Sequence, residues 1–273
     1  MKRILYLIIA ALLPLMAFAQ TDPDVIEFAF ISDTHKFGPS ADIRYADENI
    51  KAFVNYCNEN RSIKFALHGG DFMNAYDTNK KQALFCLERA RQDFQGLRVP
   101  FYATKGNHDC NGKQRTADGR KDGSQIVTDH EFFNLFSPVS PINPMADPTD
   151  IVYDKNNLEG NYFYRDFPQQ KFRLIVLNDY DRDSLEYFGY HGLQVKWVTE
   201  KALNFMDKEN PEDWCFLMLG HGLSVNMYEH PINRVIHAYV RGELLEDSDH
   251  GVSYRGDFHN QKRAKMVAFL AGH

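Results

Sequence analysis

Five apolar segments of this chain are each followed at once by Asp, Asn or His, in most cases beside a glycine. These polar clusters are residues 32–35, 69–71, 105–109, 220–222 and 272–273. Apolar segments of this length are typical of buried strands, and ligands of open α/β sheets bind at the carboxyl ends of their strands. Glycine at such an end lets the backbone turn sharply and brings side chains toward one point. The pattern therefore predicts an α/β sheet with a polar site at its carboxyl edge.

The first third of the chain alternates predicted strands with predicted helices. Apolar residues recur at helical spacing over residues 43–60 and 79–95, which favours two amphipathic helices. The strands expected around them are residues 25–32, 64–68 and 99–104. A βαβαβ order of this kind argues for a largely parallel sheet with right-handed crossovers.

The rest of the chain predicts a long surface segment followed by further regular elements. Residues 111–160 are rich in Gly, Pro, Asn and Asp, and long segments of this composition are often functional loops. The elements expected in and after it are a short helix at 129–136, a hairpin of 161–167 with 172–178, a helix at 193–208, and strands at 214–219 and 266–270. We find no repeat and no linker, so one domain over residues 20–273 is expected.

The first nineteen residues have the features of a secretory signal peptide. Lys2 and Arg3 precede an apolar run over residues 4–16, and small residues two apart follow it. The run is shorter than the about 20 apolar residues of a membrane-spanning helix. We therefore expect an exported protein, periplasmic or secreted, without a stable membrane anchor.

The charge of the chain disfavours nucleic acid as a partner. It carries 31 Lys and Arg against 37 Asp and Glu, a net charge of −6, which becomes −8 without the two basic residues of the signal peptide. A protein that binds nucleic acid through its phosphates normally has an excess of positive charge. The oligomeric state is left open by the sequence.

Four cysteines are too few for a disulfide scaffold in a chain of this length. Cys57 and Cys86 fall on apolar faces of expected helices and Cys215 lies in an expected strand, which favours buried free thiols. Cys110 adjoins one of the polar clusters, where a packing role is favoured over a catalytic one.

The residues at the strand ends suit divalent metal ions of intermediate hardness, which bind carboxylate, carboxamide and imidazole. Asp33 and Asp71 would bring two negative charges to a pair of divalent ions, and the remaining donors are neutral. With a bridging hydroxide, such a centre stays near +1 and attracts a phosphate oxyanion, as in two-metal catalysis. The neutral donors are His35, Asn107, His221 and His273.

Taken in order, these clusters resemble the motifs of the calcineurin-like metallophosphoesterase superfamily. The matching residues are Asp33-x-His35, Gly70-Asp71, Gly106-Asn107-His108-Asp109, Gly220-His221 and Gly272-His273. Each piece alone is weak, but the five in order are specific, and the resemblance runs from residue 25 to the end. It implies a two-sheet αββα sandwich with its metal site at the carboxyl ends of the strands.

The resemblance also implies a role for each residue in hydrolysing a phosphate ester. Two divalent ions (Mn, Fe or Zn) would be held, with a hydroxide that bridges them attacking phosphorus in line. The implied metal ligands are Asp33 and His35 for the first ion, Asp71 for both, and Asn107, His221 and His273 for the second. His108 would assist the leaving group, and Asp109 would orient the His108 ring and raise its basicity.

One departure from the family pattern and two alternative functions stay open. The family's last motif has another histidine two positions after the first, whereas the sequence ends at His273. We therefore expect that the chain natively continues and carries that histidine. The expected substrate is a small phosphorylated molecule. The alternatives are a phosphodiesterase or nuclease rather than a monoesterase, or a catalytically silent exported binding module, although the intact ligand set argues against a silent site.

Weaker candidates surround the main clusters. His68 is either a packed strand-end histidine or a support for a metal ligand. Residues 178–181 and His191 follow an expected core strand and are minor candidates for lining the pocket. The basic residues of 113–121 can meet a second phosphate, but a solvated loop is favoured.

Overall fold

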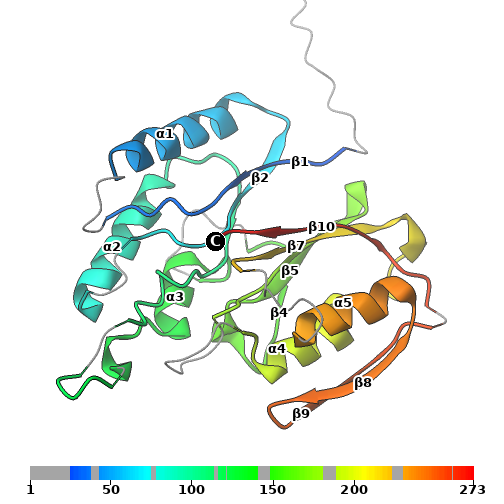
Figure 1. The fold of residues 1–273 in the computed structure, drawn as a ribbon. Coiled ribbons are helices and arrows are strands. Elements are labelled where there is room, and N and C mark those ends of the chain that lie inside the picture. The colour runs from blue at the N-terminus through cyan, green and yellow to red at the C-terminus, as the bar shows by residue number, and fades with distance from the viewer. Residues whose placement is uncertain are drawn as a thin grey trace, which may run out of the picture.

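The structure is a computed structural model that describes residues 25–37, 43–74, 78–113, 116–120, 122–140, 148–180, 189–222, 230–259 and 261–273. The expected signal peptide lies outside the described residues. Two β-sheets face each other in the middle of the molecule, and helices cover the outer face of each sheet (Figure 1). This arrangement is the predicted αββα sandwich. In the part described, no helix is both long enough and apolar enough to cross a membrane.

The first sheet is parallel throughout, as predicted. Its strands, in the order β1-β2-β3, are β1 (Glu27–Ile31), β2 (Ile63–His68) and β3 (Phe101–Ala103). The helices of this half are α1 (Ile43–Glu59), α2 (Lys80–Asp93) and α3 (Asp129–Phe136). They bury apolar side chains such as Ile50 and Leu87 against the outer face of the sheet. These elements match the expected ones to within a few residues.

The second sheet is mixed, with the strand order β10-β7-β6-β5-β4. Its strands are β4 (Ile151–Tyr153), β5 (Phe163–Phe167), β6 (Phe172–Val176), β7 (Cys215–Gly220) and β10 (Lys265–Ala271). The predicted hairpin is the antiparallel pair β5–β6, while β6, β7 and β10 run parallel. The parallel strands therefore bring the ends of β7 and β10 to one edge.

Helices and a hairpin cover the outer face of the second sheet. They are α4 (Gly192–Trp197) with a π-helical turn (Val198–Ala202), α5 (Pro231–Arg241), and the hairpin of β8 (Leu244–Asp249) with β9 (Val252–Asp257). Short 3₁₀ turns lie at Gly123–Gln125, Leu158–Gly160, Pro168–Gln170 and Pro211–Asp213.

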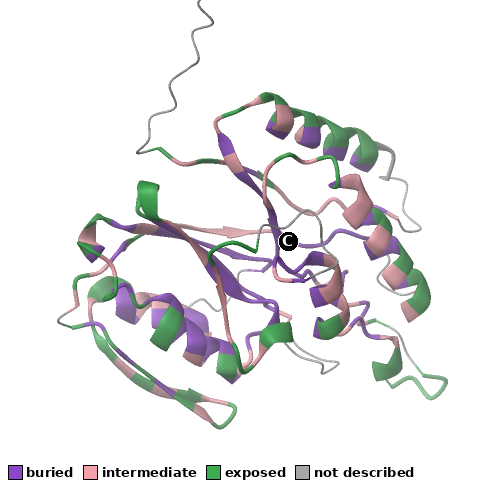
Figure 2. Cartoon of the chain, turned by 180° about the vertical axis from the view of Figure 1, so that it is seen from behind, coloured by how far each residue is buried: buried purple, intermediate pink, exposed green. Residues whose placement is uncertain are grey.

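The hydrophobic core between the sheets explains why the central strands read as continuous apolar runs. Phe65 and Leu67 of β2 pack in one cluster with Leu174 and Val176 of β6 and Leu217 of β7. Strands buried on both faces need apolar side chains in both directions. Figure 2 shows this buried layer running through the centre of the chain.

Several expectations about the second half were wrong or incomplete. The helix expected at 193–208 ends at Ala202, although Phe205 is buried as expected. The sequence did not lead us to expect β4, α5 or the β8–β9 hairpin. β4 has three residues, and the hairpin is rich in exposed charged side chains instead of alternating apolar ones. The cysteines are free thiols; Cys57 and Cys86 are buried, whereas Cys110 and Cys215 are half-buried.

Candidate metal centre

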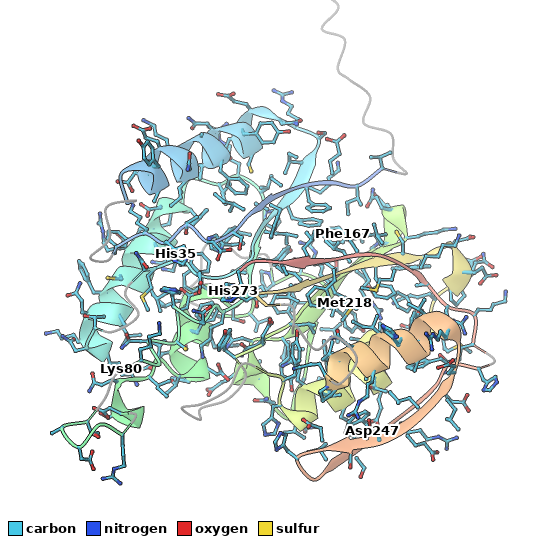
Figure 3. The ribbon with its side chains drawn as sticks, in the orientation of Figure 1. His35, Lys80, Phe167, Met218, Asp247 and His273 are labelled. Atoms are coloured by element: carbon cyan, nitrogen blue, oxygen red, sulfur yellow. The ribbon has the colours of Figure 1, made fainter. Side chains whose placement is uncertain are left out.

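The strand ends of both sheets meet at one place. The backbone N–H of Asp33 donates to the carbonyl of Gly70 at 3.0 Å, which joins the ends of β1 and β2. The N–H of His273, after β10, donates to the Asp33 carboxylate at 2.9 Å, which joins the second sheet to the first. Figure 3 shows His35 and His273 at this shared edge, and Figure 1 places the end of the chain there.

Four of the predicted ligands adopt a backbone conformation that is uncommon for residues other than glycine. The φ angles of Asp33, His35, Asp71 and His273 are 52°, 45°, 57° and 63°. Such left-handed residues are strained and cluster at functional sites. Hydrogen bonds between the two turns hold them, as from His35 N–H to the Asp71 carbonyl at 3.0 Å.

Asp71 lies between two groups of potential ligand atoms. On one side, Nε2 of His35 lies 3.9 Å from Oδ2 of Asp71 and 3.7 Å from Oδ1 of Asp33. On the other side, Nε2 of His221 lies 3.3 Å from the same Asp71 oxygen. Ligand atoms of Asp71, His221 and His273 all lie within 4.8 Å of one another.

Distances and chemistry both fit divalent metal ions. Two ligands on one ion at about 2.1 Å lie roughly 3.0–3.5 Å apart. The His221 side matches this, since Nε2 of His221 is also 3.1 Å from Oδ1 of Asn107, and the His35 side is slightly wider. Imidazole, carboxylate and carboxamide donors suit Mn, Fe and Zn.

Asp71 and His221 form a buried pair, and their electrostatics favour a positive charge between them. Burial alone would lower the pKa of His221, but the hydrogen bond and charge of Asp71 raise it to about 9. Burial would conversely raise the pKa of Asp71, yet His221 holds it below its usual value. The ring of His221 is also oriented from behind, because its Nδ1 lies 2.6 Å from the Gly69 carbonyl oxygen.

Asp109 has a contact that the expected role, orienting the His108 ring, did not include. Its carboxylate accepts hydrogen bonds from backbone amides. The donors are the N–H groups of Asp71 (2.8 Å), Phe72 (2.8 Å), Met73 (3.4 Å) and Gly106 (2.9 Å). The carboxylate is fully buried, and burial raises its pKa to about 7. Asp109 therefore positions the turn that carries Asp71.

His108 lies beside this turn, half-buried at the edge of an open cavity. Its backbone N–H donates to Oδ1 of Asp71 at 2.8 Å, and its ring packs edge-on against that of His35 with centroids 4.6 Å apart. Burial lowers the pKa of its imidazole. The ring lines an open cavity of about 610 Å³ with the ends of β1 and with Tyr45 and Asn49 of α1.

Comparison with known proteins gives the same reading as the geometry. Residues 26–270 match the family model described as calcineurin-like phosphoesterase. The chain belongs to this family.

Relatives of this calcineurin-like protein include manganese-dependent ADP-ribose/CDP-alcohol diphosphatases. That of Bos taurus is 27% identical over 200 residues, which covers 64% of this chain and 51% of the relative. That of Oryza sativa is 23% identical over 188 residues, which covers 68% and 47%. The chain thus spans about half the length of the curated relatives it matches. A dimetal phosphatase from Danio rerio shares the fold, with a TM-score of 0.53 and 12% identity over 87% of this chain and 90% of that one.

Asp179 directly follows Asn178 at the end of β6 and contacts the site more closely than its position in the sequence indicated. Both residues are fully buried, and neither is among the residues that line the cavity beside His108. The Asp179 carboxylate accepts hydrogen bonds from the backbone N–H groups of His221 (3.1 Å) and Gly222 (2.5 Å). Burial raises its pKa to about 6. Its place after a buried strand was the only sequence signal.

His68 supports the calcineurin-like site from outside the ligand set, whereas His191 caps a helix. His68 is fully buried against Phe72, and its Nδ1 accepts from the N–H of Gly70 at 3.1 Å, so it is both packed and supportive. His191 caps α4, where its Nδ1 accepts from the N–H of Leu193 at 3.1 Å.

The structure also shows the surroundings of two further candidates from the sequence, the basic residues of 113–121 and Cys110. Lys113 and Arg120 are exposed, and Arg120 pairs with Asp118 at 2.7 Å, as in a solvated loop. Arg115 and Lys121 lie outside the described residues. Burial raises the pKa of Cys110, whose thiol donates to the Asn107 carbonyl at 3.0 Å, so this cysteine is not an activated nucleophile.

Proposed function

We propose that this protein is a metal-dependent phosphoesterase that acts on a small phosphorylated substrate. The observation that carries the proposal is the position of Asp71, whose carboxylate belongs to two groups of potential ligand atoms, one with His35 and His108 and one with His221 and His273, each within 4.8 Å. One carboxylate shared by two groups is the arrangement that a two-metal site requires. The family match supports the same reading.

Two sets of residues would hold the ions. Asp33 and His35 would hold one ion, and Asn107, His221 and His273 the other, with Asp71 binding both. When bound, such ions lower the pKa of water and neutralise charge on a phosphoryl group.

The chain's own residues would orient the substrate and handle the proton of the leaving group. His108 lines the open cavity beside the centre, so its imidazole can donate a proton to a departing oxygen that lies there. The carboxylate of Asp71 fixes the backbone of His108 by accepting its N–H. A substrate phosphate at the centre would thus place its leaving group in the cavity, between His108 and α1.

The substrate that we propose to test first is a diphosphate of the ADP-ribose or CDP-alcohol type, with Mn²⁺. The support is the printed activity of the relatives, which share 23–27% identity with this chain. The net charge of −6 makes long nucleic acids a poor alternative.

The decisive assay uses the purified chain with Mn²⁺, Zn²⁺ or Fe²⁺ and three substrates, namely an aryl phosphate, a bis-aryl phosphate and ADP-ribose. We expect turnover of at least one of them, with Mn²⁺ among the supporting metals. No turnover of any substrate with any metal would contradict the enzyme proposal and leave a binding module. Preferred turnover of the bis-aryl ester would favour a phosphodiesterase.

We also propose that the chain is exported, on the basis of its first nineteen residues. The full chain with a carboxyl-terminal tag, produced in a bacterium with a periplasm, should be recovered outside the cytoplasm. Mass spectrometry should then find residue 20 at its amino terminus. Recovery in the cytoplasm with residues 1–19 intact would contradict export.

A further inference from the structure

His221 is held by both sheets at once. Its ring is oriented by the first sheet, where Gly69 O lies 2.6 Å from Nδ1 and Asn107 lies 3.1 Å from Nε2. Its backbone is held by the second sheet, where its N–H donates to Oδ1 of Asp179 at 3.1 Å. With both holds in place, Nε2 of His221 lies 3.3 Å from Asp71.

Asp179 is built into the end of the second sheet in a way that serves this turn. It follows β6, which is the neighbour of β7. One of its carboxylate oxygens accepts the backbone N–H of His221, and the other accepts the backbone N–H of Gly222. The side chain is completely buried. A buried carboxylate is costly unless hydrogen bonds satisfy it, so its presence here needs these donors.

The glycine before His221 is explained by Asp179. A Cβ atom at Gly220 would lie 2.9 Å from Oδ1 of Asp179 and 2.9 Å from the ring of Phe269. Real Cβ atoms do not approach so closely. Gly220 therefore allows the carboxylate to reach the backbone of the turn.

Tyr190 closes the other side of Asp179. This tyrosine is 4% exposed, and its hydroxyl donates a hydrogen bond to the Asp179 carboxylate. The backbone of Asp179 is held as well, because Gly189 N–H donates to its carbonyl at 2.7 Å. Contacts with Tyr190 and Gly189 therefore hold Asp179 in the position from which it binds the His221 turn.

We propose that Asp179, held by Tyr190, is a positioning residue for the metal centre and does for His221 what Asp109 does for Asp71. Each is a fully buried carboxylate at the end of one strand that accepts consecutive backbone N–H groups from the ligand-bearing turn of the neighbouring strand. The inference rests on the proposed function in that it takes His221 as a metal ligand.

Replacement of Asp179 by Asn keeps the size of the side chain and removes half of its capacity to accept. The carboxamide oxygen can serve one of the two N–H groups, while its NH₂ group faces the other N–H and cannot accept from it. The turn must then shift or lose a hydrogen bond. Loss of a group that orients a ligand typically lowers metal affinity about 10–100-fold.

The test measures Mn²⁺ binding to the metal-free full chain by equilibrium dialysis, together with the melting temperature without metal. We expect two classes of site in the unmodified chain. Asp179→Asn should weaken one class at least about 10-fold and leave the other within about 2-fold, because only His221 depends on it. Tyr190→Phe should weaken the same class by a smaller factor.

Asp166→Asn is the matched control, because Asp166 is a half-buried carboxylate of the second sheet that bonds to Arg173 instead of a ligand turn. It should lower the melting temperature and leave both Mn²⁺ affinities unchanged. Unchanged affinities in Asp179→Asn, or an equal loss in Asp166→Asn, would overturn the proposal.

Two further variants keep the test informative if Asp179→Asn does not fold. Gly220→Ala crowds the carboxylate and Tyr190→Phe removes one donor to it, and both should weaken the class that contains His221. Unaltered Mn²⁺ binding in these two variants would count against a positioning role. Two Mn²⁺ bound by the unmodified chain without any turnover would contradict the proposed function alone, because the readout here is binding.

Discussion

The two halves of the molecule contribute differently to the same site. The first half, with β1 to β3, supplies both acidic ligands and presents Asp33, His35 and Asp71 on left-handed turns. The second half supplies two imidazoles, His221 and His273, from the ends of β7 and β10. In the proposed site, the negative charge that would attract metal ions therefore belongs to the first half, and neutral donors from the second half would complete the set of ligands. The metal centre depends on how the two sheets pack.

Both halves nevertheless hold their ligand turns with the same device. Asp109 accepts N–H groups from the turn after β2, and Asp179 accepts them from the turn after β7. In each case the carboxylate follows a neighbouring strand of the same sheet, β3 beside β2 for Asp109 and β6 beside β7 for Asp179. A side chain can thus hold a strained or glycine-rich turn that has no regular hydrogen bonds of its own.

The largest expected effect comes from Asp71→Asn, because this residue belongs to both groups of ligand atoms. The change removes the charge that both ions share, so we expect phosphoesterase activity to fall at least about 1,000-fold, beyond the 10–100-fold typical of residues that only support a ligand. Initial rates with saturating Mn²⁺ measure it. Full activity in this variant would show that Asp71 does not join the two halves.

His108→Ala separates chemistry from metal binding within the first half. Removal of a proton donor should lower kcat about 100-fold, while the bound Mn²⁺ stays within experimental error of the unmodified chain. Rates with leaving groups of different acidity provide the control, since a good leaving group needs no proton and should lose less. An equal loss for all leaving groups would contradict the proton-donor role.

Asp109→Asn tests whether the first half depends on its buried carboxylate. The amide has one acceptor oxygen for the N–H groups of Asp71, Phe72 and Gly106, so we expect about a 10-fold loss of activity. Because Asp71 serves both ions, both classes of Mn²⁺ site should weaken, in contrast to the single class expected for Asp179→Asn. Weakening of only one class would argue against the shared role of Asp71.

Asp166→Asn has the smallest expected effect on activity and a clear effect on stability. Arg173 is fully buried, and it reaches Asp166 through Nε at 2.6 Å and through Nη2 at 2.9 Å. Loss of the carboxylate leaves the buried guanidinium uncompensated, which should lower the free energy of unfolding by about 3 kcal/mol at pH 7. Denaturant unfolding measures this, and rates below the unfolding transition should match the unmodified chain.

The ion pair of Asp166 with Arg173 also predicts that the free energy of unfolding depends on pH. Burial alone would raise the pKa of Asp166, but Arg173 and Lys208 hold it below its usual value. The folded pKa is therefore below the unfolded one, which is about 3.9, so the pair stabilises the fold above about pH 4 and the contribution is lost as pH falls through the folded pKa. The difference in unfolding free energy between the unmodified chain and Asp166→Asn should shrink at low pH. A constant difference between pH 7 and pH 3 would contradict this assignment.

The two halves also differ in how well the sequence predicted their strands and helices. The first half is a run of βαβ units, in which neighbours in the chain are neighbours in space, so its strands and helices were predicted to within a few residues. In the second half, β10 pairs with β7 across a long connection, and the β8–β9 hairpin is made of largely exposed polar strands. Apolar periodicity carries little information about such elements.

The sequence by itself predicted an α/β sheet and the candidate donor atoms of the site, because buried strands are apolar and these polar residues stand at their ends, and its family resemblance implied the αββα class. Only the tertiary structure decided which carboxylates bind backbone and which face the centre. Asp71 and Asp109 are both aspartates at strand ends, yet one lies between His35 and His221 and the other accepts amide N–H groups. Every residue except proline carries such an N–H, so these partners leave no mark in the sequence.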